Sequence, residues 1–248
     1  MKRKILVLIS AFAAFIFIIA VLLYNGIIWF NNPSSGKYPV RGVDVSHHQG
    51  MIDWEVLSQQ GIDFAFIKAT EGSSFRDSRF GYNWENARKT HLKVRAYHFY
   101  SFESSGVTQA QNFISVVPVE KDMLPPVIDF EFYGNVEKNP PEMEKALQIL
   151  DDIISALEDH YGMRPIIYAT PRAYKLYLEG AYEDYPIWIR DVFRKPDWLT
   201  RGWTFWQYSN RKVLKGYEGR ERFIDMNVFN GTQADFEKFI EESRLDRP

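Results

Sequence analysis

Two acidic residues stand inside an apolar stretch of the chain. Residues 127–132 read VIDFEF, so Asp129 and Glu131 alternate with apolar side chains in a pattern typical of a buried strand. Side chains alternate between the two faces of a strand, so both carboxyl groups point the same way, roughly 6.6 Å apart along the chain. A buried carboxylate without a partner is costly or takes up a proton. The pair is therefore either a structural ion-pair site or the acid and base of an active site.

The elements that position this pair alternate between strands and helices. Apolar runs bounded by turn residues predict eight strands, at residues 42–45, 63–69, 94–100, 127–132, 165–169, 186–189, 204–208 and 223–228. Apolar residues at helical spacing predict helices at residues 53–60, 78–91, 105–117, 141–161, 171–178 and 232–243, the last capped by Thr232. Alternation of this kind implies a mostly parallel sheet with right-handed crossovers. Because the last three strands lie close together in sequence, we expect an irregular eight-stranded (β/α) TIM-like barrel with fewer than eight helices.

Polar residues gather where the predicted strands end, and in such barrels the active site lies at the C-terminal ends of the strands. The first and last strands are neighbours in a closed barrel, so Asp44 and Asp225 should lie close together. The sequence thus predicts that the acidic side chains converge on one rim. The residues expected at this rim are Asp44, Glu71, His98, Asp129, Glu131, Thr170, Arg190, Asp191, Gln207 and Asp225.

The N-terminus has the pattern of a membrane segment. Three basic residues precede an apolar run over residues 5–23, which is longer than the core of a cleavable signal peptide and about long enough to span a bilayer. Trp29 suits the membrane interface, and the basic residues predict a cytoplasmic N-terminus. We expect a membrane anchor over residues 1–30, with a cleaved signal as the alternative, a polar linker over 31–40 and the barrel over 41–243. The barrel would then lie outside the cytoplasm, periplasmic or at the cell surface, or be secreted if the signal is cleaved.

Composition narrows the classes of function. The chain has 248 residues and no cysteine, which excludes disulfides, thiolate metal sites and a cysteine nucleophile. Without the three basic residues of the tail, 27 Lys and Arg stand against 32 Asp and Glu, a net charge of −5. This balance, with no basic stripe, argues against a nucleic-acid partner.

Seven motifs in sequence order carry a family resemblance. They are GVDVSHHQG (42–50), FIKATEG (66–72), AYHFY (96–100), VIDFEFYGN (127–135), IIYAT (166–170), FWQYS (205–209) and IDMNVFNG (224–231). Together they resemble the glycoside hydrolase family 25 lysozymes, the Chalaropsis-type N-acetylmuramidases, from about residue 41 to residue 231. The resemblance implies an irregular eight-stranded barrel. It also implies hydrolysis of the β-1,4 bond between N-acetylmuramic acid and N-acetylglucosamine in peptidoglycan, with no cofactor.

The resemblance also assigns roles to four carboxyl groups. Glu131 matches the catalytic acid of the family and Asp129 its partner in the D-x-E motif. Asp44 matches the first-strand aspartate, and Asp225 the aspartate of the last-strand D-x-N motif. Glycoside cleavage needs a protonated acid at the leaving oxygen and negative charge near the oxocarbenium-like centre. Inverting, retaining and substrate-assisted routes all remain open, with Asp129 in the last case orienting the acetamido group of the substrate.

Aromatic and amide side chains near the strand ends are candidates for binding sugar, because sugar rings stack their C–H faces on π surfaces. The expected substrate-binding residues are Tyr97, His98, Tyr133, Tyr168, Trp188 and Gln207, with Trp206 and Tyr208 as further candidates. Strand aromatics are, however, more often core residues. His98 is expected to hydrogen-bond a carboxylate at the barrel mouth rather than to act as a base. One stretch departs from the family pattern: residues 188–198 read WIRDVFRKPDW, where Arg190 and Asp191 either alter distant subsites or pair with each other.

Other interpretations remain for several of these residues. Glu71 has an alternative partner in Lys68, three residues away. His47 and His48 suggest a metal site, but neighbours in a strand point oppositely, so no metal is expected. The alternatives for the whole chain are a glycosidase on another N-acetylated glycan and a catalytically silent glycan-binding domain. The sequence lacks the chitinase pattern D-x-x-D-x-D-x-E, which weighs against the glycosidase on another glycan. The four retained acids weigh against a silent glycan-binding domain. We expect a monomer whose partners are peptidoglycan strands and, through the N-terminal helix, the membrane.

Overall fold

A closed barrel of eight strands forms the body of the protein. The computed structural model describes residues 2–120 and 123–245, and within them one sheet has the order β1-β9-β8-β7-β6-β5-β4-β2-β3. A further pairing of β1 with β2 closes the barrel and leaves the two-residue β3 as an appendage. The expectation of an eight-stranded α/β barrel is thereby confirmed. The strands are β1 (Arg41–Val45), β2 (Phe64–Glu71), β3 (Phe75–Arg76), β4 (Lys93–Phe99), β5 (Val127–Phe130), β6 (Ile166–Ala169), β7 (Ile187–Arg190), β8 (Phe205–Lys212) and β9 (Ile224–Phe229).

The last strand runs against its neighbours. Strands β1 to β8 of the barrel wall pair in parallel, but β9 is antiparallel to both β8 and β1. The C-terminal ends of the parallel strands therefore share one rim with the N-terminal end of β9. Asp225 is the second residue of β9, so it lies at the predicted rim because β9 runs antiparallel. The reversed direction of β9 was not predicted from the sequence.

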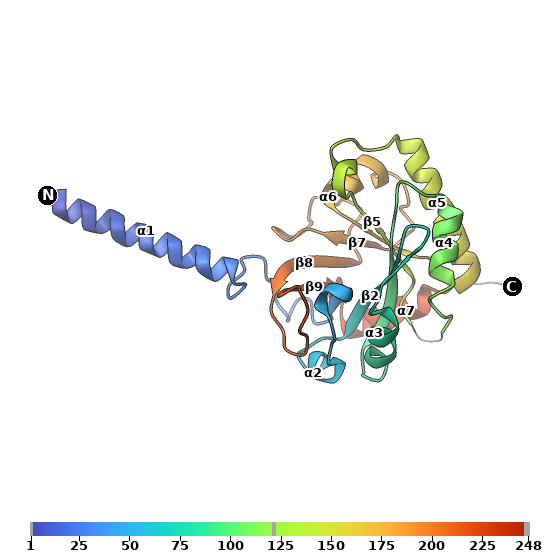
Figure 1. Cartoon of the computed structure of the whole chain (residues 1–248), viewed down its shortest axis with the longest axis horizontal. Helices are drawn as coiled ribbons and strands as arrows, with labels where there is room; N and C mark the ends of the chain where they lie inside the picture. Colours follow the sequence, from blue (N-terminus) through green and yellow to red (C-terminus); the bar gives the residue numbers. More distant parts are fainter. Residues whose placement is uncertain (1, 121–122, 246–248) are drawn as a thin grey trace.

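The described residues hold seven α-helices, and six of them (α2 to α7) belong to the barrel domain, which confirms a helical coat of fewer than eight. Thr232 caps the last of them by accepting a hydrogen bond from the backbone N–H of Asp235, as predicted. The segment predicted as one helix at 171–178 is a short α-helix followed by a π-helix (η3, Tyr174–Leu178). The helices are α1 (Lys2–Tyr24), α2 (Trp54–Ser58), α3 (Phe80–Ala87), α4 (Gly106–Ile114), α5 (Met143–Tyr161), α6 (Pro171–Ala173) and α7 (Gln233–Glu242); Figure 1 shows α4 and α5 beside each other on the outside of the barrel.

Aromatic side chains fill the interior of the barrel below the rim. The rings of Phe66 and Tyr168 lie 4.5 Å from the ring of Trp188, measured between centroids. Phe64 packs under Phe66 at 5.3 Å and against β1, where a Cβ on Gly42 would overlap its ring. Glycine at position 42 is thus required by the close approach of Phe64. The result is a dry, apolar floor beneath the polar residues of the rim.

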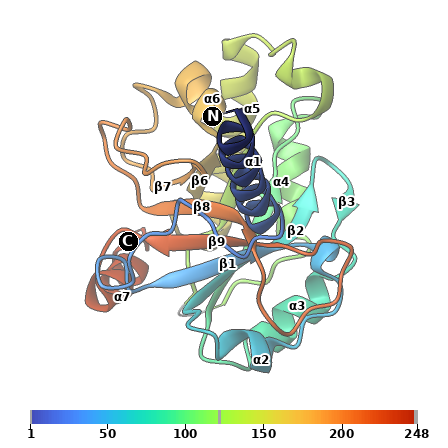
Figure 2. The ribbon, with the colours of Figure 1, turned by 90° about the vertical axis from the view of Figure 1, so that its left-hand side faces the viewer.

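The N-terminal helix α1 stands away from the barrel. By length and composition its residues Arg3–Tyr24 can cross a membrane, and none of this span is buried against the rest of the protein. Figure 1 shows α1 projecting from the side of the barrel where β7 and β8 end, and Figure 2 looks along α1 onto that side.

The segment predicted as a polar linker, residues 31–40, lies on the barrel surface rather than free in solvent. Asn31 is buried and its side-chain amide donates to the backbone carbonyls of Asp191, at 3.1 Å, and Tyr208, at 2.9 Å. Tyr38 and Val40 are buried as well. Asn31, which the sequence places in a polar linker, therefore connects the loop after β7 with strand β8.

Candidate active site

Four carboxyl groups meet in one cavity at the barrel mouth. Asp44, Asp129, Glu131 and Asp225 all line this cavity, which has a volume of about 410 Å³. Of the predicted substrate-binding residues, the structure brings Tyr97, Tyr168, Trp188 and Gln207 to the same cavity. The remaining lining residues are Val45, Ser46, His48, Gln49, Lys68, Phe99, Arg190, Asn210, Glu221 and Phe223.

Asp44 is held by two amide groups. Its Oδ2 accepts hydrogen bonds from Gln207 Nε2 at 2.9 Å and from Asn227 Nδ2 at 2.8 Å. Each amide is oriented in turn by a ring on the barrel floor. The hydroxyl of Tyr168 donates to Gln207 Oε1 at 3.1 Å, and Trp188 Nε1 donates to Asn227 Oδ1 at 2.8 Å. Burial raises the pKa of Asp44, and the two amide donors oppose that rise because they stabilise the ionised form.

Asp225 lies directly opposite Asp44 on the neighbouring strand. The two residues are register partners in the β1–β9 pair, as expected from barrel closure. Gln207 Nε2 is also 3.4 Å from Asp225 Oδ2, so one amide contacts both acids. Burial and the charge of Asp44 raise the pKa of Asp225 well above its ordinary value. The pair therefore keeps a proton on Asp225 under conditions where Asp44 is ionised.

Asp129 is a buried carboxyl group with an unused oxygen. It is nearly inaccessible, and its Oδ1 has no hydrogen-bond partner among the described residues. Burial, followed by the charge of Glu131, raises the pKa of Asp129 well above its ordinary value. A buried polar atom of this kind costs free energy unless a ligand satisfies it. Asp129 is thus poised to accept a hydrogen bond from a bound molecule.

Glu131 lies one residue beyond the end of β5, where it is only partly buried. The sequence pattern predicted a strand to residue 132, but β5 ends at Phe130, so Glu131 stands on the rim itself. Burial raises the pKa of Glu131 to about 7, although the positive charges of Arg190 and Lys68 lower it. Glu131 can therefore hold a proton at neutral pH and still release it.

Two cations line the cavity. Arg190 was expected at this rim, whereas Lys68 was expected only as a possible partner of Glu71. Lys68, in the second half of β2, forms an ion pair with Glu71 at 2.7 Å, the alternative partner considered for that glutamate. Arg190 ends β7 and lines the cavity, whereas Asp191 turns away and accepts hydrogen bonds from the backbone N–H groups of residues 193 and 194. The signal in the sequence was a basic residue within an apolar strand (Lys68) or at its end (Arg190), the same signal that identified the acids.

Four predicted contacts with substrate do not reach the cavity. His98 is wholly buried on the outer face of β4, where its ring nitrogens lie 2.7 Å from Thr70 Oγ1 and 3.1 Å from Gln109 Oε1; burial lowers its pKa to about 4. The expected bond from His98 to a rim carboxylate is therefore wrong. Trp206 and Tyr208 also face outward, because they alternate with the inward-facing Gln207.

Tyr133 lies one layer beyond the cavity. Its ring packs 5.7 Å from that of Phe99, which does line the cavity, and its hydroxyl lies 3.1 Å from Ser101 Oγ. Phe99 therefore lines the cavity, whereas Tyr133, which was expected to bind substrate there, does not.

His47 and His48 lie on a 3-10 turn (η1, His47–Gln49) and not on a strand. Their rings are side by side, 4.1 Å apart, so the argument that they point oppositely is wrong. His47 Nδ1 is 2.8 Å from Asp77 Oδ2, which gives it a carboxylate partner. Among the residues that the structure describes, no group of three His, Cys, Asp or Glu side chains is arranged to hold a metal ion.

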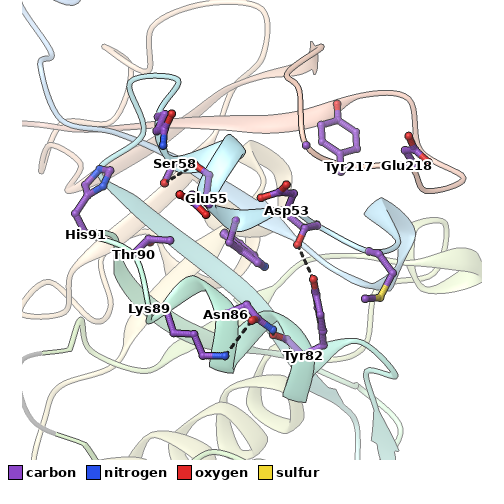
Figure 3. Close-up of a pocket in the computed structure, with 15 residues that line it drawn as sticks. Asp53, Glu55, Ser58, Tyr82, Asn86, Lys89, Thr90, His91, Tyr217 and Glu218 are labelled. Carbon is purple, nitrogen blue, oxygen red and sulfur yellow. Dashed lines mark hydrogen bonds between the residues drawn. The ribbon is translucent and has the colours of Figure 1, made fainter.

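A larger groove lies elsewhere, between α2, α3 and the loop before β9. It has a volume of about 950 Å³, and Figure 3 shows the side chains that line it. Its polar groups serve the local structure: Asp53 caps α2 through the N–H of Val56, and the Tyr82 hydroxyl donates to the carbonyl of Ile52. The smaller cavity is therefore the candidate active site, because it alone among the cavities of the described residues brings several buried or partly buried acids to one space.

The arrangement at the rim suits acid catalysis. It offers a proton donor with a pKa near neutrality, unpaired carboxylate oxygen and hydrogen-bonded negative charge within one cavity.

Comparison with known proteins decides the family. The profile of the glycosyl hydrolases family 25 matches residues 43–217. The chain belongs to glycosyl hydrolase family 25. Its structure superimposes on that of a family 25 glycosyl hydrolase from Bacillus anthracis with a TM-score of 0.80 and 51% sequence identity, covering 84% of this chain and 97% of the other.

Named lysozymes lie among the relatives of this family 25 chain. Lysozyme M1 of Streptomyces globisporus is 31% identical over 212 residues, which cover 79% of this chain and 69% of that protein. The N,O-diacetylmuramidase of Chalaropsis sp is 26% identical over 209 residues, covering 77% and 96%. These matches confirm the family resemblance drawn from the seven motifs.

Proposed function

We propose that this family 25 hydrolase is a muramidase, which cleaves the β-1,4 bond between N-acetylmuramic acid and N-acetylglucosamine in peptidoglycan. The observation that carries the proposal is the position of Glu131, a rim carboxyl group with a raised pKa beside three more acids at the mouth of the barrel. The relatives named lysozyme and diacetylmuramidase support the choice of substrate.

Glu131 acts as the general acid in this proposal. It gives its proton to the glycosidic oxygen as the bond from that oxygen to C1 of the muramoyl unit breaks. Water supplies the hydroxyl group at C1, and the remaining proton of that water returns to the carboxylates of the site, which restores the acid. Negative charge on Asp44, fixed by Gln207 and Asn227, stabilises the positive charge that develops on the sugar ring. The unsatisfied Oδ1 of Asp129 accepts a hydrogen bond from the substrate, and an acetamido N–H is a donor of the right kind.

Release of reducing ends from purified peptidoglycan by the full chain in detergent tests the assignment. We expect release by the wild type and a loss of about 100- to 10,000-fold in Glu131→Gln, since the amide cannot donate the required proton. Glu144→Gln on the exposed side of α5 is a matched control and should keep full activity. Equal release by wild type and Glu131→Gln would contradict the role of Glu131. If the wild type bound peptidoglycan without cleaving it, the domain would be a glycan-binding module instead.

The same proposal places the enzyme outside the cytoplasm with α1 retained as its anchor. Peptidoglycan lies outside the cytoplasmic membrane, and α1 has the length and composition to cross it. We therefore expect the protein in the membrane fraction with an intact N-terminus. A mature N-terminus within residues 20–40, found by mass spectrometry of a soluble form, would show that α1 is a cleaved signal.

A further inference from the structure

An exposed apolar patch lies where α1 meets the barrel. It consists of Ile27, Ile28, Trp29 and Phe30, which follow α1, together with Phe193 from the loop after β7; we call these five residues the tether patch. The exposed fractions of Ile27, Phe30 and Phe193 are 67%, 61% and 68%. Large apolar side chains that gather in the open mark a binding surface rather than a core.

The tether patch is fixed to the barrel, although its outer face is bare. Trp29 Nε1 donates to the carbonyl oxygen of Val192 at 3.2 Å. The rings of Phe30 and Phe193 stack with centroids 6.1 Å apart. Asn31, next in the chain, is anchored by its two bonds to the rim. The apolar side chains are therefore presented by a defined surface and not by a free tail.

The end of α1 is joined to the rim that carries the catalytic cavity. Arg222 Nη1 donates to Asn25 Oδ1 at 2.8 Å, and Arg211 Nη1 lies 3.3 Å from the carbonyl oxygen of Tyr24. Gly26, with φ of +67°, packs so closely that a Cβ there would lie 2.8 Å from the ring of Phe223. Phe223 lines the cavity. One wall of the cavity thus lies against the turn that follows the apolar helix.

The surroundings of the tether patch match the surface of a bilayer. Aromatic and aliphatic side chains just beyond a membrane span are typical of the interface, where the ring is buried and its polar edge stays wet. The side chains of Arg194, Lys212 and Arg222 are exposed on the same rim segments, and cations there attract anionic lipid headgroups. Because residues 27–30 of the tether patch follow α1 directly, an anchored α1 would keep the patch next to the bilayer.

We propose that the tether patch docks onto the membrane surface and so holds the catalytic cavity at the bilayer. The inference rests on the proposed retention of α1 as an anchor. Docking fixes which side of the barrel faces the membrane, because the patch belongs to the β7–β9 side of the rim. The glycan presented to Glu131 would then be the strand nearest the membrane, rather than glycan deep in the wall.

Single-cysteine labelling tests this orientation, since the chain has no cysteine of its own. The full chain is reconstituted into phosphatidylcholine–phosphatidylglycerol vesicles with an environment-sensitive fluorophore at Arg194→Cys, beside the patch, or at Lys238→Cys, on α7. Both positions are exposed lysine or arginine sites in the native chain. We expect lipids that carry a nitroxide near the headgroup to quench the label at position 194 at least threefold more than the label at 238. Phe30→Ser combined with Phe193→Ser should reduce the quenching at 194 without releasing the protein from the vesicles.

Flotation of the vesicles separates the two ways in which the idea can fail. Flotation with equal, weak quenching at both positions would overturn docking and leave the anchor in place. Loss of the protein from the floating vesicles would overturn the anchor and docking together.

Discussion

Asp44 and Asp225 face each other across the β1–β9 pair and share the side-chain amide of Gln207. The contact exists because β9 runs antiparallel, which brings its second residue to the rim where the parallel strands end. Ionising two neighbouring carboxyl groups in a buried site costs free energy, because the two negative charges repel each other. One member of the pair therefore ionises at lower pH than the other. Asp44 keeps two amide donors and is the member better suited to carry the charge.

The activity should fall as the pH rises through neutrality. Glu131 acts in its protonated form, and its pKa is about 7. Above that value the acid form declines about tenfold for each further pH unit, so kcat/KM should decline in parallel. Initial rates of reducing-end release between pH 4 and pH 9 measure this limb. A rate that stays constant from pH 6 to pH 9 would contradict Glu131 as the acid.

Replacement of Glu131 should stabilise the fold at alkaline pH. Folding raises the pKa of Glu131 from its ordinary value of 4.5 to about 7, so the native state binds more protons than the unfolded state between these values. Its contribution to the free energy of unfolding therefore falls as the pH rises from 4.5 to 7, and above 7 the ionised group destabilises the fold. We expect Glu131→Gln to raise the free energy of unfolding by roughly 1–3 kcal/mol at pH 8. Urea denaturation at pH 8 and at pH 4 checks this, because the gain should vanish at pH 4.

Loss of the amide that holds Asp44 should shift the acidic limb of the pH profile. Gln207→Leu removes a donor to the ionised carboxylate, so the pKa of Asp44 should rise further. We expect kcat/KM to fall about 10- to 100-fold, in keeping with one hydrogen bond to a charged group. The acidic limb of the pH profile should also move to higher pH. Gln233→Leu, on the exposed start of α7, is the control; an acidic limb that does not move in Gln207→Leu would exclude a role in tuning Asp44.

His98 should matter for stability and not for catalysis. His98→Ala leaves Thr70 and Gln109 without their buried partner, which costs about 1–3 kcal/mol for each unsatisfied group. Because the ring faces away from the cavity, kcat should stay within about twofold of the wild type. Thermal unfolding and steady-state kinetics separate the two effects. A tenfold loss of kcat in a variant of unchanged stability would return His98 to the active site.

The bridge made by Asn31 should contribute to the stability of the rim. Asn31→Ala removes the donor that the carbonyls of Asp191 and Tyr208 share, although the Asp191 carbonyl keeps a second donor, the indole N–H of Trp206. We expect the free energy of unfolding to fall by about 1–3 kcal/mol. The neighbouring Asn32 is exposed, and Asn32→Ala should have no measurable effect. Equal stability of the two variants would show that residues 31–40 are a passive linker after all.

Much of the fold could be predicted from the sequence, because the type and order of the strands and helices depend on the spacing of apolar residues along short segments. The eight strands, the long helix that ends near Tyr161 and the Thr232 cap all follow from the spacing of apolar residues and from capping chemistry. The alternation of Asp129 with Phe130 predicted which side chains face inward. Pattern alone could not give the reversed direction of β9, since a strand reads the same in either direction.

The sequence by itself determined the family, the barrel and the identity of the acids. Only the tertiary structure decided which neighbours those acids meet. The alternation of side chains along β4 and β8 directs His98, Trp206 and Tyr208 outward. Lys68 within β2 and Arg190 at the end of β7 face the cavity instead. The protonation of Glu131 depends on that assembly, because burial and the net charge around a carboxyl group exist only once distant segments have packed together.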